Sequence, residues 1–109
     1  MAYTPKKLYT GQPNTTATTV YTAPASTTTI VKNIVICNTS ASDATITVHF
    51  VPSAGSASAS NRIISSLSVT ANNTVIIECS GVLATGDFIS AQQGTSSAIT
   101  LHITGVEVA

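Results

Sequence analysis

The stretch Ala44–Val51 reads Ala-Thr-Ile-Thr-Val-His-Phe-Val, and its alternation decides the class of fold. Ile46, Val48 and Phe50 fall on one side of an extended chain, while two threonines and a histidine fall on the other. A strict period of two is typical of a half-buried β-strand. We therefore expect a strand over residues 44–51 whose apolar side faces a core.

Similar β-type runs recur on both sides of this stretch, with turn residues between them. The expected strands are Thr16–Thr22, Thr28–Asn38, Ala44–Val51, Arg62–Thr70, Thr74–Cys79, Asp87–Gln92 and Ala98–Val108. The run Thr28–Asn38 is apolar on both faces, as a central strand would be. Short strands separated by turns predict an all-β fold, an antiparallel β-sandwich of about seven to eight strands, jelly-roll-like or immunoglobulin-like.

The composition agrees with this class of fold. The 109 residues include 19 threonines and 14 serines but only four Lys/Arg and four Asp/Glu. Threonine suits the half-exposed face of a strand, because its branched carbon is stiff and its hydroxyl faces water. So few basic residues predict no binding of nucleic acid, which needs several cations against the phosphates. The chain shows no signal peptide and no spanning segment, so we expect synthesis in the cytoplasm and no membrane insertion.

The sequence divides into an extended N-terminal arm, residues 1–14, and one β-sandwich domain, residues 15–109. Pro5 and Pro13 disfavour a central strand in the arm. Leu8 and Tyr9 could pin the arm to a neighbouring copy, and they are the residues that we expect at an oligomer contact. Scarce charge also favours life inside an assembly, because a free monomer with so few ions is poorly soluble.

Parity within the strands predicts which side chains form the core. The expected core residues are Ile46, Val48, Phe50, Ile63, Leu67, Val69, Val75, Ile77, Leu101 and Ile103. Apolar parity flips once in the last strand, at Gly105, so we expect a β-bulge at Thr104-Gly105 that keeps Val106 and Val108 buried. The small-residue segment Pro52–Asn61 is expected to bury nothing and to be mobile.

The residues able to do chemistry match no catalytic or metal-binding arrangement, so we expect no enzyme, no cofactor and no metal. His49 and His102 lie at polar positions of their strands and are expected to be exposed, although neighbouring strands could bring them together around a metal. The carboxylates are expected to have structural or solvent-facing roles: Asp43 and Asp87 in turns, and Glu78 and Glu107 on the solvent side of strands. Cys37 and Cys79 are expected to be buried free thiols, with a disulfide between neighbouring strands as the alternative.

Several phrases of the chain, taken together, resemble small structural proteins from the tail region of tailed bacteriophages of Gram-positive hosts. They are LYTGQP (Leu8–Pro13), TTVYTAPASTTTIVKNIVICNTS (Thr18–Ser40), ITVHFVPSAG (Ile46–Gly55), NRIISSLSV (Asn61–Val69) and GVLATGDFISAQQG (Gly81–Gly94). The chain is similar in this respect to the shoulder β-sandwich of siphophage receptor-binding proteins, which docks on the baseplate.

This resemblance implies a structural or adaptor role in a phage tail or tail tip, related to host attachment, and location in the virion. It also implies other phage tail proteins as partners and a homo-oligomer, with a trimer preferred by analogy. The chain lacks the neck and head domains of a full receptor-binding protein, so direct receptor binding is not part of the expectation. The alternative is a free-standing adhesion or carbohydrate-binding β-sandwich module.

Overall fold

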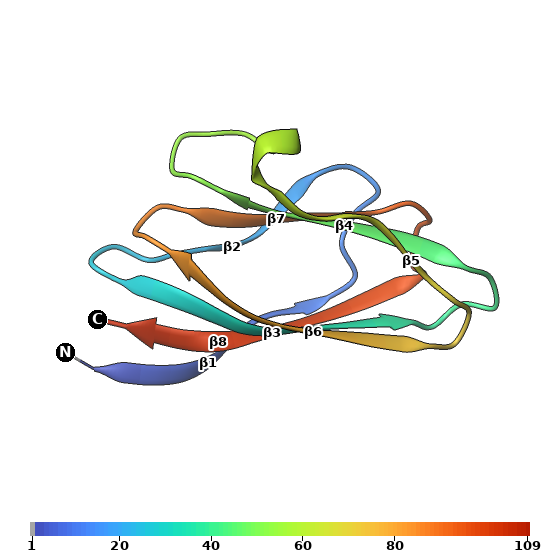
Figure 1. Ribbon diagram of the computed structural model, residues 1–109, viewed down its shortest axis with the longest axis horizontal. Coiled ribbons are helices and arrows are strands. Elements are labelled where there is room, and N and C mark those ends of the chain that lie inside the picture. Colours follow the sequence, from blue (N-terminus) through green and yellow to red (C-terminus); the bar gives the residue numbers. More distant parts are fainter. Residues whose placement is uncertain (1) are drawn as a thin grey trace.

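Eight antiparallel strands make up most of the chain in the computed structural model, which describes residues 2–109 (Figure 1). They are β1 (Tyr3–Gly11), β2 (Thr18–Thr22), β3 (Thr28–Asn38), β4 (Ala44–Val51), β5 (Arg62–Val69), β6 (Thr74–Leu83), β7 (Phe88–Gln93) and β8 (Ile99–Val108), with a short 3-10 turn, η1 (Ala59–Asn61), before β5. The predicted antiparallel β-sandwich is confirmed. The predicted bounds of β3 and β4 also agree with the structure, and β6 runs four residues beyond the Cys79 end expected from sequence.

The strands form two four-stranded sheets packed face to face, which we call sheet A and sheet B. Sheet A has the order β1-β8-β3-β6 and sheet B the order β2-β7-β4-β5. The pairs β1–β8, β2–β7, β3–β6 and β4–β5 are nested, as though one long hairpin folded at its middle had been rolled up. This order is that of a jelly roll, which decides between the two sandwich types left open by the sequence.

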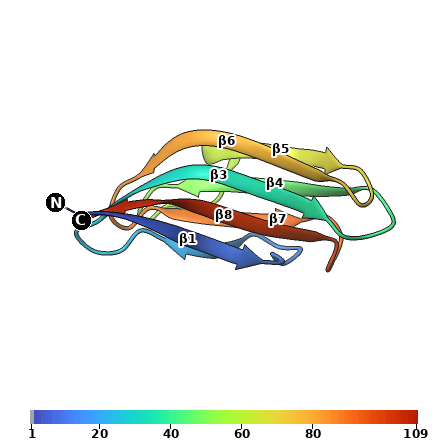
Figure 2. The same ribbon diagram turned by 90° about the horizontal axis from the view of Figure 1, so that it is seen from below.

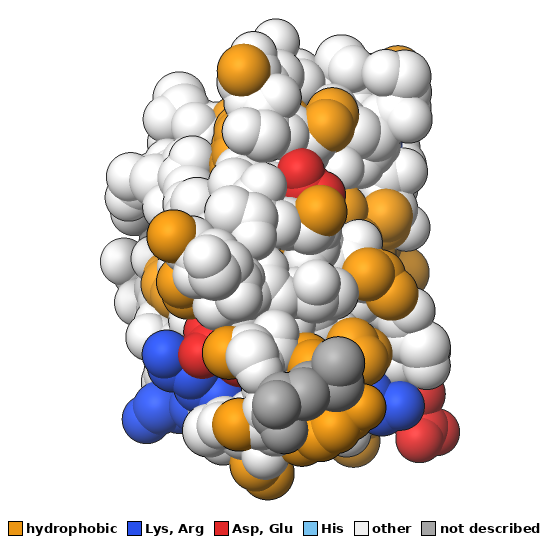
Figure 3. Space-filling model, turned by 90° about the vertical axis from the view of Figure 1, so that its left-hand side faces the viewer, with side chains coloured by type: hydrophobic (Ala, Val, Ile, Leu, Met, Phe, Trp, Pro, Cys, Tyr) orange, Lys and Arg blue, Asp and Glu red, His pale blue; other side chains and the backbone are white. Residues whose placement is uncertain are grey.

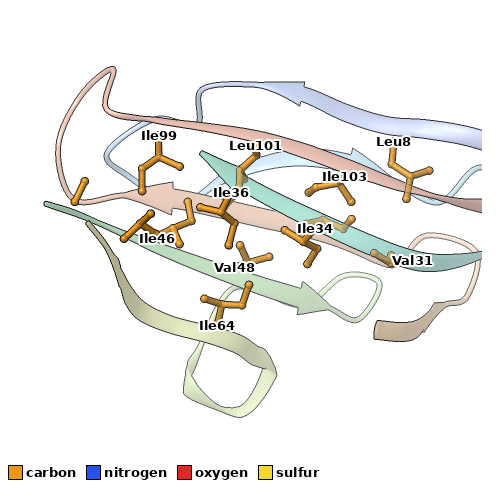
Figure 4. Close-up of a cluster of buried hydrophobic side chains, with 14 of the residues drawn as sticks. Leu8, Val31, Ile34, Ile36, Ile46, Val48, Ile64, Ile99, Leu101 and Ile103 are labelled. Atoms are coloured by element: carbon orange, nitrogen blue, oxygen red, sulfur yellow. The ribbon is translucent and has the colours of Figure 1, made fainter. Parts of the chain in front are cut away.

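The core lies between the sheets and is built almost wholly from aliphatic side chains (Figure 4). Its fully enclosed members include Ile34 and Ile36 of β3, Ile46 of β4 and Leu101 of β8, none of which exposes any surface. Burying one such side chain stabilises the fold by about 1.5–3 kcal/mol. Of the residues expected in the core, Val48, Val69 and Ile103 are also buried, and Phe50, Leu67, Val75 and Ile77 pack against the cluster while half-buried.

The prediction for Ile63 is wrong: Ile63 is 45% exposed, and its neighbour Ile64 is buried at 6%. Moving along β4 from Ile46 to Val48, the partner residue on β5 moves from Leu67 to Ile64. One residue of β4 is thus matched by two of β5, Ser65 and Ser66, and Ser66 has a positive φ of 46°. This bulge reverses the parity of β5, so counting back from Leu67 gives the wrong isoleucine.

The predicted bulge at Thr104-Gly105 lies on the neighbouring strands instead. The pairing with β8 shifts at Leu8 of β1 and at Lys32 of β3, while β8 itself stays regular. A Cβ on Gly105 would overlap the carbonyl oxygen of Ile30, so the glycine permits a close approach of the backbones. Because β8 does not bulge, its side chains keep alternating beyond Gly105.

Two further predictions on β8 are corrected by this alternation. Val106 and Val108 are not core residues: they are half-buried on the outer side of sheet A. Glu107, expected to face solvent, instead lies on the core-facing side, where its side chain is 14% exposed.

Most of the predicted N-terminal arm is an integral strand. Residues 3–11 form β1, which pairs with β8 at the edge of sheet A, and Ala2 exchanges two backbone hydrogen bonds with Ala109 (Figure 2). Pro5 is compatible with this place, because an edge strand has one side free of ladder hydrogen bonds. Met1 lies outside the described residues.

The segment between β4 and β5, residues 52–61, arches over the outer face of sheet B (Figure 1). Most of its side chains are exposed, as predicted. However, the segment shields Val51, an outward-facing residue of β4 with no exposed surface, whose Cγ1 lies 3.4 Å from where a Cβ on Gly55 would be. The carboxylate of Asp87 fixes the segment by accepting a hydrogen bond from the backbone N–H of Ser53 at 2.9 Å.

Candidate interaction surface

The outer face of sheet A is the part of the surface with the strongest functional signal. No other part of described residues 2–109 lies over this face, in contrast to the covered face of sheet B (Figures 1 and 2). Among residues 2–109, three of the four large apolar side chains that are strongly exposed belong to this face, namely Tyr3, Ile76 and Val82, at 62–67% exposure. Exposed apolar patches rimmed by polar groups are typical of interaction sites.

A first apolar row crosses all four strands of this face near the two termini. It joins Pro5 of β1, Val106 of β8, Ile30 of β3 and Val82 of β6, which are in register with one another. Tyr3 and Val108, a cross-strand pair on the same face, extend the row toward the end of the sheet. Figure 3 shows hydrophobic side chains gathered on the sheet A side of this end of the molecule, with charged side chains on both flanks.

A second row lies farther along the strands and is apolar on the β3–β6 side. Thr10, His102, Val35 and Ile76 are aligned across the four strands. His102 is exposed, as predicted, and its Nδ1 is 3.4 Å from the Thr10 hydroxyl. This row continues the apolar surface but is polar toward β1.

Between the two apolar rows lies a polar row whose ends have opposite charge. Lys7 on edge strand β1 pairs with Thr104, which pairs with Asn33, which in turn pairs with Glu78 on edge strand β6. The pairing of β3 with β6 is irregular here, and a recess of about 330 Å³ opens between Lys32 and Glu78. Lys7 thus lies at the β1 edge of the face and Glu78 at the β6 edge, where Lys32 lines the same recess as Glu78.

The outer face of sheet B has a different character, because hydroxyl and amide side chains dominate it. His49 lies on this face but is only 3% exposed, which corrects the prediction of an exposed histidine. Its Nε2 accepts a hydrogen bond from Nε of Arg62 at 3.2 Å, so the imidazole is neutral with its proton on Nδ1. Burial, and secondarily the positive charge of Arg62, lower the pKa of His49 below its ordinary value.

The predicted oligomer residues, Leu8 and Tyr9, point into the sandwich. Leu8 is 8% exposed within the core cluster, and Tyr9 packs against that cluster. Their strand still contributes to the candidate surface, through Tyr3, Pro5 and Lys7 on its opposite face. The sequence signal for this surface was the run of apolar residues on both faces of β3.

The carboxylates hold the structure together at several points. Asp43 accepts a hydrogen bond from the backbone N–H of Ala71 at 3.1 Å, and Asp87 accepts from the N–H groups of Ser53 and Ala84. Both roles agree with the turn positions predicted for them. Glu78 is exposed on edge strand β6, as predicted.

Glu107 joins the two sheets through Tyr21 of β2. The Tyr21 hydroxyl donates to Glu107 at 2.6 Å and lies 2.8 Å from the Thr29 hydroxyl, while Lys6 lies 3.3 Å from the same carboxylate. Burial, followed by the hydrogen bond to Glu107, raises the pKa of Tyr21 to about 12. The cluster is a hydrogen-bonded link between sheets.

A polar depression of about 360 Å³ opens at the other end of the sandwich. It is lined by Gln12, Pro13, Asn14, Thr15, Thr16, Gln93, Ser96 and Ser97. Gln93 is 2% exposed, and its side chain accepts from the N–H groups of Ala98 and Ile99 and donates to the carbonyl of Pro13. Gln93 thus organises the loops around the depression.

Both cysteines are free, as predicted, but they are half-buried rather than buried. Cys37 lies on the outer face of sheet A, whereas Cys79 packs against the core and its thiol contacts the carbonyl of Val31 at 3.3 Å. Among residues 2–109, no three His, Cys, Asp or Glu side chains gather closely enough to hold a metal ion. The same residues include no helix long and apolar enough to cross a membrane.

No protein-family model matches the sequence, and comparisons with curated proteins and with solved structures find no match.

Proposed function

We propose that this protein is a non-enzymatic structural or adaptor component of a larger assembly and that it acts through its surface. The single observation that carries the proposal is the uncovered outer face of sheet A, with one apolar row and a second row that is apolar on its β3–β6 side. Only 7% of the residues are charged, yet Ile76 and Val82 are each 62% exposed. A partner that covers these two side chains removes their apolar surface from water.

The assembly that we propose is a bacteriophage tail or tail tip, with the protein in the virion and associated with itself and with other tail proteins. The resemblance of the strand and turn phrases to tail-region proteins supports this choice. Jelly rolls also occur in viral structural proteins and in lectins, which is an analogy of fold alone. The resemblance to shoulder domains extends the proposal to a role related to host attachment.

The location in the virion can be tested by peptide mass spectrometry on particles purified by density gradient from a producing culture. We expect peptides of this chain to sediment with the infectious particles in constant ratio to other tail proteins. Recovery only as free protein would contradict the proposal. Genes for a tape-measure protein and a holin beside its own would agree with it, and a secretion cassette there would count against it.

The polar depression beside Gln93 favours a second candidate, a free-standing adhesion or carbohydrate-binding module. Hydroxyl and amide groups from Gln12, Asn14, Thr15 and Ser97 line this depression and could bind sugar hydroxyls. A glycan array probed with the labelled protein tests this candidate. Binding that Asn14→Ala abolishes would support it, and the absence of any bound glycan would remove it.

A further inference from the structure

We propose that the outer face of sheet A binds the same face of a second copy of this chain, across a two-fold axis roughly parallel to the strands. This inference deepens the proposed function by naming the partner that covers the surface, and it rests on that function. It also replaces the predicted contact through Leu8 and Tyr9, which lie inside the sandwich.

The first apolar row is complementary to itself under this symmetry. An axis along the strands, between β8 and β3, places β1 opposite the partner's β6 and β8 opposite the partner's β3. The facing pairs are Pro5 with Val82, Val106 with Ile30, His102 with Val35 and Thr10 with Ile76, each formed twice. In the first row apolar side chains therefore meet apolar side chains and Val82 becomes buried, whereas in the second row the partner's His102 and Thr10 cover Val35 and Ile76.

The charges select this axis over its main alternative. Lys7 at the β1 edge comes opposite Glu78 at the partner's β6 edge, and the pair occurs twice. A two-fold axis that is parallel to the sheet but perpendicular to the strands, passing over this polar row, would place Lys7 against Lys7 and Glu78 against Glu78. Like charges facing each other disfavour that arrangement, so the two Lys7–Glu78 pairs favour the axis along the strands, although exposed ion pairs add little affinity.

The size of the face also fits a second copy. Four strands spaced about 4.8 Å apart and ten residues long at about 3.4 Å per residue give a projected area of about 650 Å². Specific protein interfaces bury about 600–1,000 Å² per partner, so the face reaches the lower end of that range. Two β-sheets can pack face to face at about 10 Å.

The other surfaces suit a second copy less well. The outer face of sheet B is partly covered by residues 52–61 and carries mainly hydroxyl groups. The free edge of sheet A at β1 contains Pro5, Lys6 and Lys7, and a proline with adjacent lysines blocks the addition of a strand. A contact through the face is thus favoured over a contact through the β1 edge.

Light scattering coupled to size exclusion, and sedimentation equilibrium, test the inference on the full chain of 11.1 kDa. We expect a dimer, and we expect Val82→Asp to weaken it at least about 100-fold, because the change buries an unpaired charge at two symmetric places. The matched control is Ile63→Asp, an exposed isoleucine on the other sheet, which should leave the dimer intact. Equal weakening by both substitutions, or a trimer, would overturn the inference.

Charge reversal tests the axis without introducing a charge into the apolar rows. Lys7→Glu and Glu78→Lys should each weaken the dimer several-fold, and the double variant should restore it. A mixture of the two single variants should form a heterodimer tighter than either homodimer. Failure of the double variant and of the mixture to recover binding would overturn the two-fold axis along the strands.

These results are separable from the test of the proposed function. A chain that is monomeric at millimolar concentration but present in purified particles would overturn this inference alone. A dimer absent from such particles would overturn the phage assignment and leave the face contact standing.

Discussion

Replacing Gln93 by leucine should cost far more stability than the same change at its neighbour Gln92. Gln93 is 2% exposed and has three hydrogen bonds to the backbone, whereas Gln92 is half-buried on the outer face of sheet B. The two residues are adjacent and chemically identical, so the substitution removes the same atoms in both. Only the position differs.

The size of the effect follows from the groups that lose their partners. Gln93→Leu leaves the N–H groups of Ala98 and Ile99 and the carbonyl of Pro13 without the side chain that binds them. Each unsatisfied buried group costs about 1–3 kcal/mol, and water from the adjacent depression can reach part of the site. We therefore expect a loss of about 3 kcal/mol, against less than about 0.5 kcal/mol for Gln92→Leu.

Urea unfolding at one fixed protein concentration measures this difference, because self-association would shift the midpoint. With a slope of about 1.5 kcal/mol/M, the midpoint of Gln93→Leu should fall by about 2 M with the slope unchanged. Midpoints of the two variants within about 0.3 M of each other would refute the account of Gln93 as the residue that ties the loops together.

Three further predictions concern single side chains. Phe50→Ala should lower the free energy of unfolding by about 3 kcal/mol, because Phe50 packs against Gly81. Thr47→Ala should lower it by about 1–2 kcal/mol, because the Thr47 hydroxyl accepts a hydrogen bond from the N–H of Ser66. Urea melts that give the reverse order would contradict the assignment of these residues to the two faces of β4. Because the pKa of His49 is lowered in the folded state, its contribution to stability is complete above about pH 6.5 and is lost as the pH falls further. The decrease in Tm on acidification should therefore be smaller in His49→Gln than in the unchanged protein, and it should persist in His102→Gln. The pKa of Tyr21 is raised to about 12 in the folded protein, so the unfolded chain loses this proton first and stability should fall between pH 10 and 12. Tyr21→Phe should remove that fall, as melts monitored by absorbance can check.

Local sequence pattern was sufficient for the strands whose neighbours stay in register. The bounds of β3 and β4 could be predicted because an apolar period of two or an apolar run on both faces depends only on local residues. The prediction failed at Ile63 because a bulge on β5 changes its parity. The predictions for Val106 and Glu107 failed because the bulges lie on β1 and β3, so β8 keeps the parity that it was expected to change. A bulge depends on which strand lies alongside, and nested pairing in a jelly roll joins residues far apart in the chain.

The site was less predictable than the fold because it depends on what covers each face. His49 has solvent parity but is buried on the outer face of sheet B, where Arg62 donates a hydrogen bond to it. Leu8 and Tyr9 looked like arm residues because Pro5 argued against a strand, yet an edge position accommodates a proline. Val82 aligns with Ile30, and Ile76 with Val35, only once β6 is known to lie beside β3.

The most direct test of the central claim is hydroxyl-radical footprinting as a function of protein concentration. The rates of oxidation of Ile76 and Val82 are compared with that of Ile63, which is exposed on the other sheet and serves as the internal reference. The account predicts that Ile76 and Val82 become protected as the protein associates, while Ile63 stays equally reactive. Protection of Ile63 with Ile76 and Val82 unchanged, or no change at any of the three in an associated sample, would contradict it.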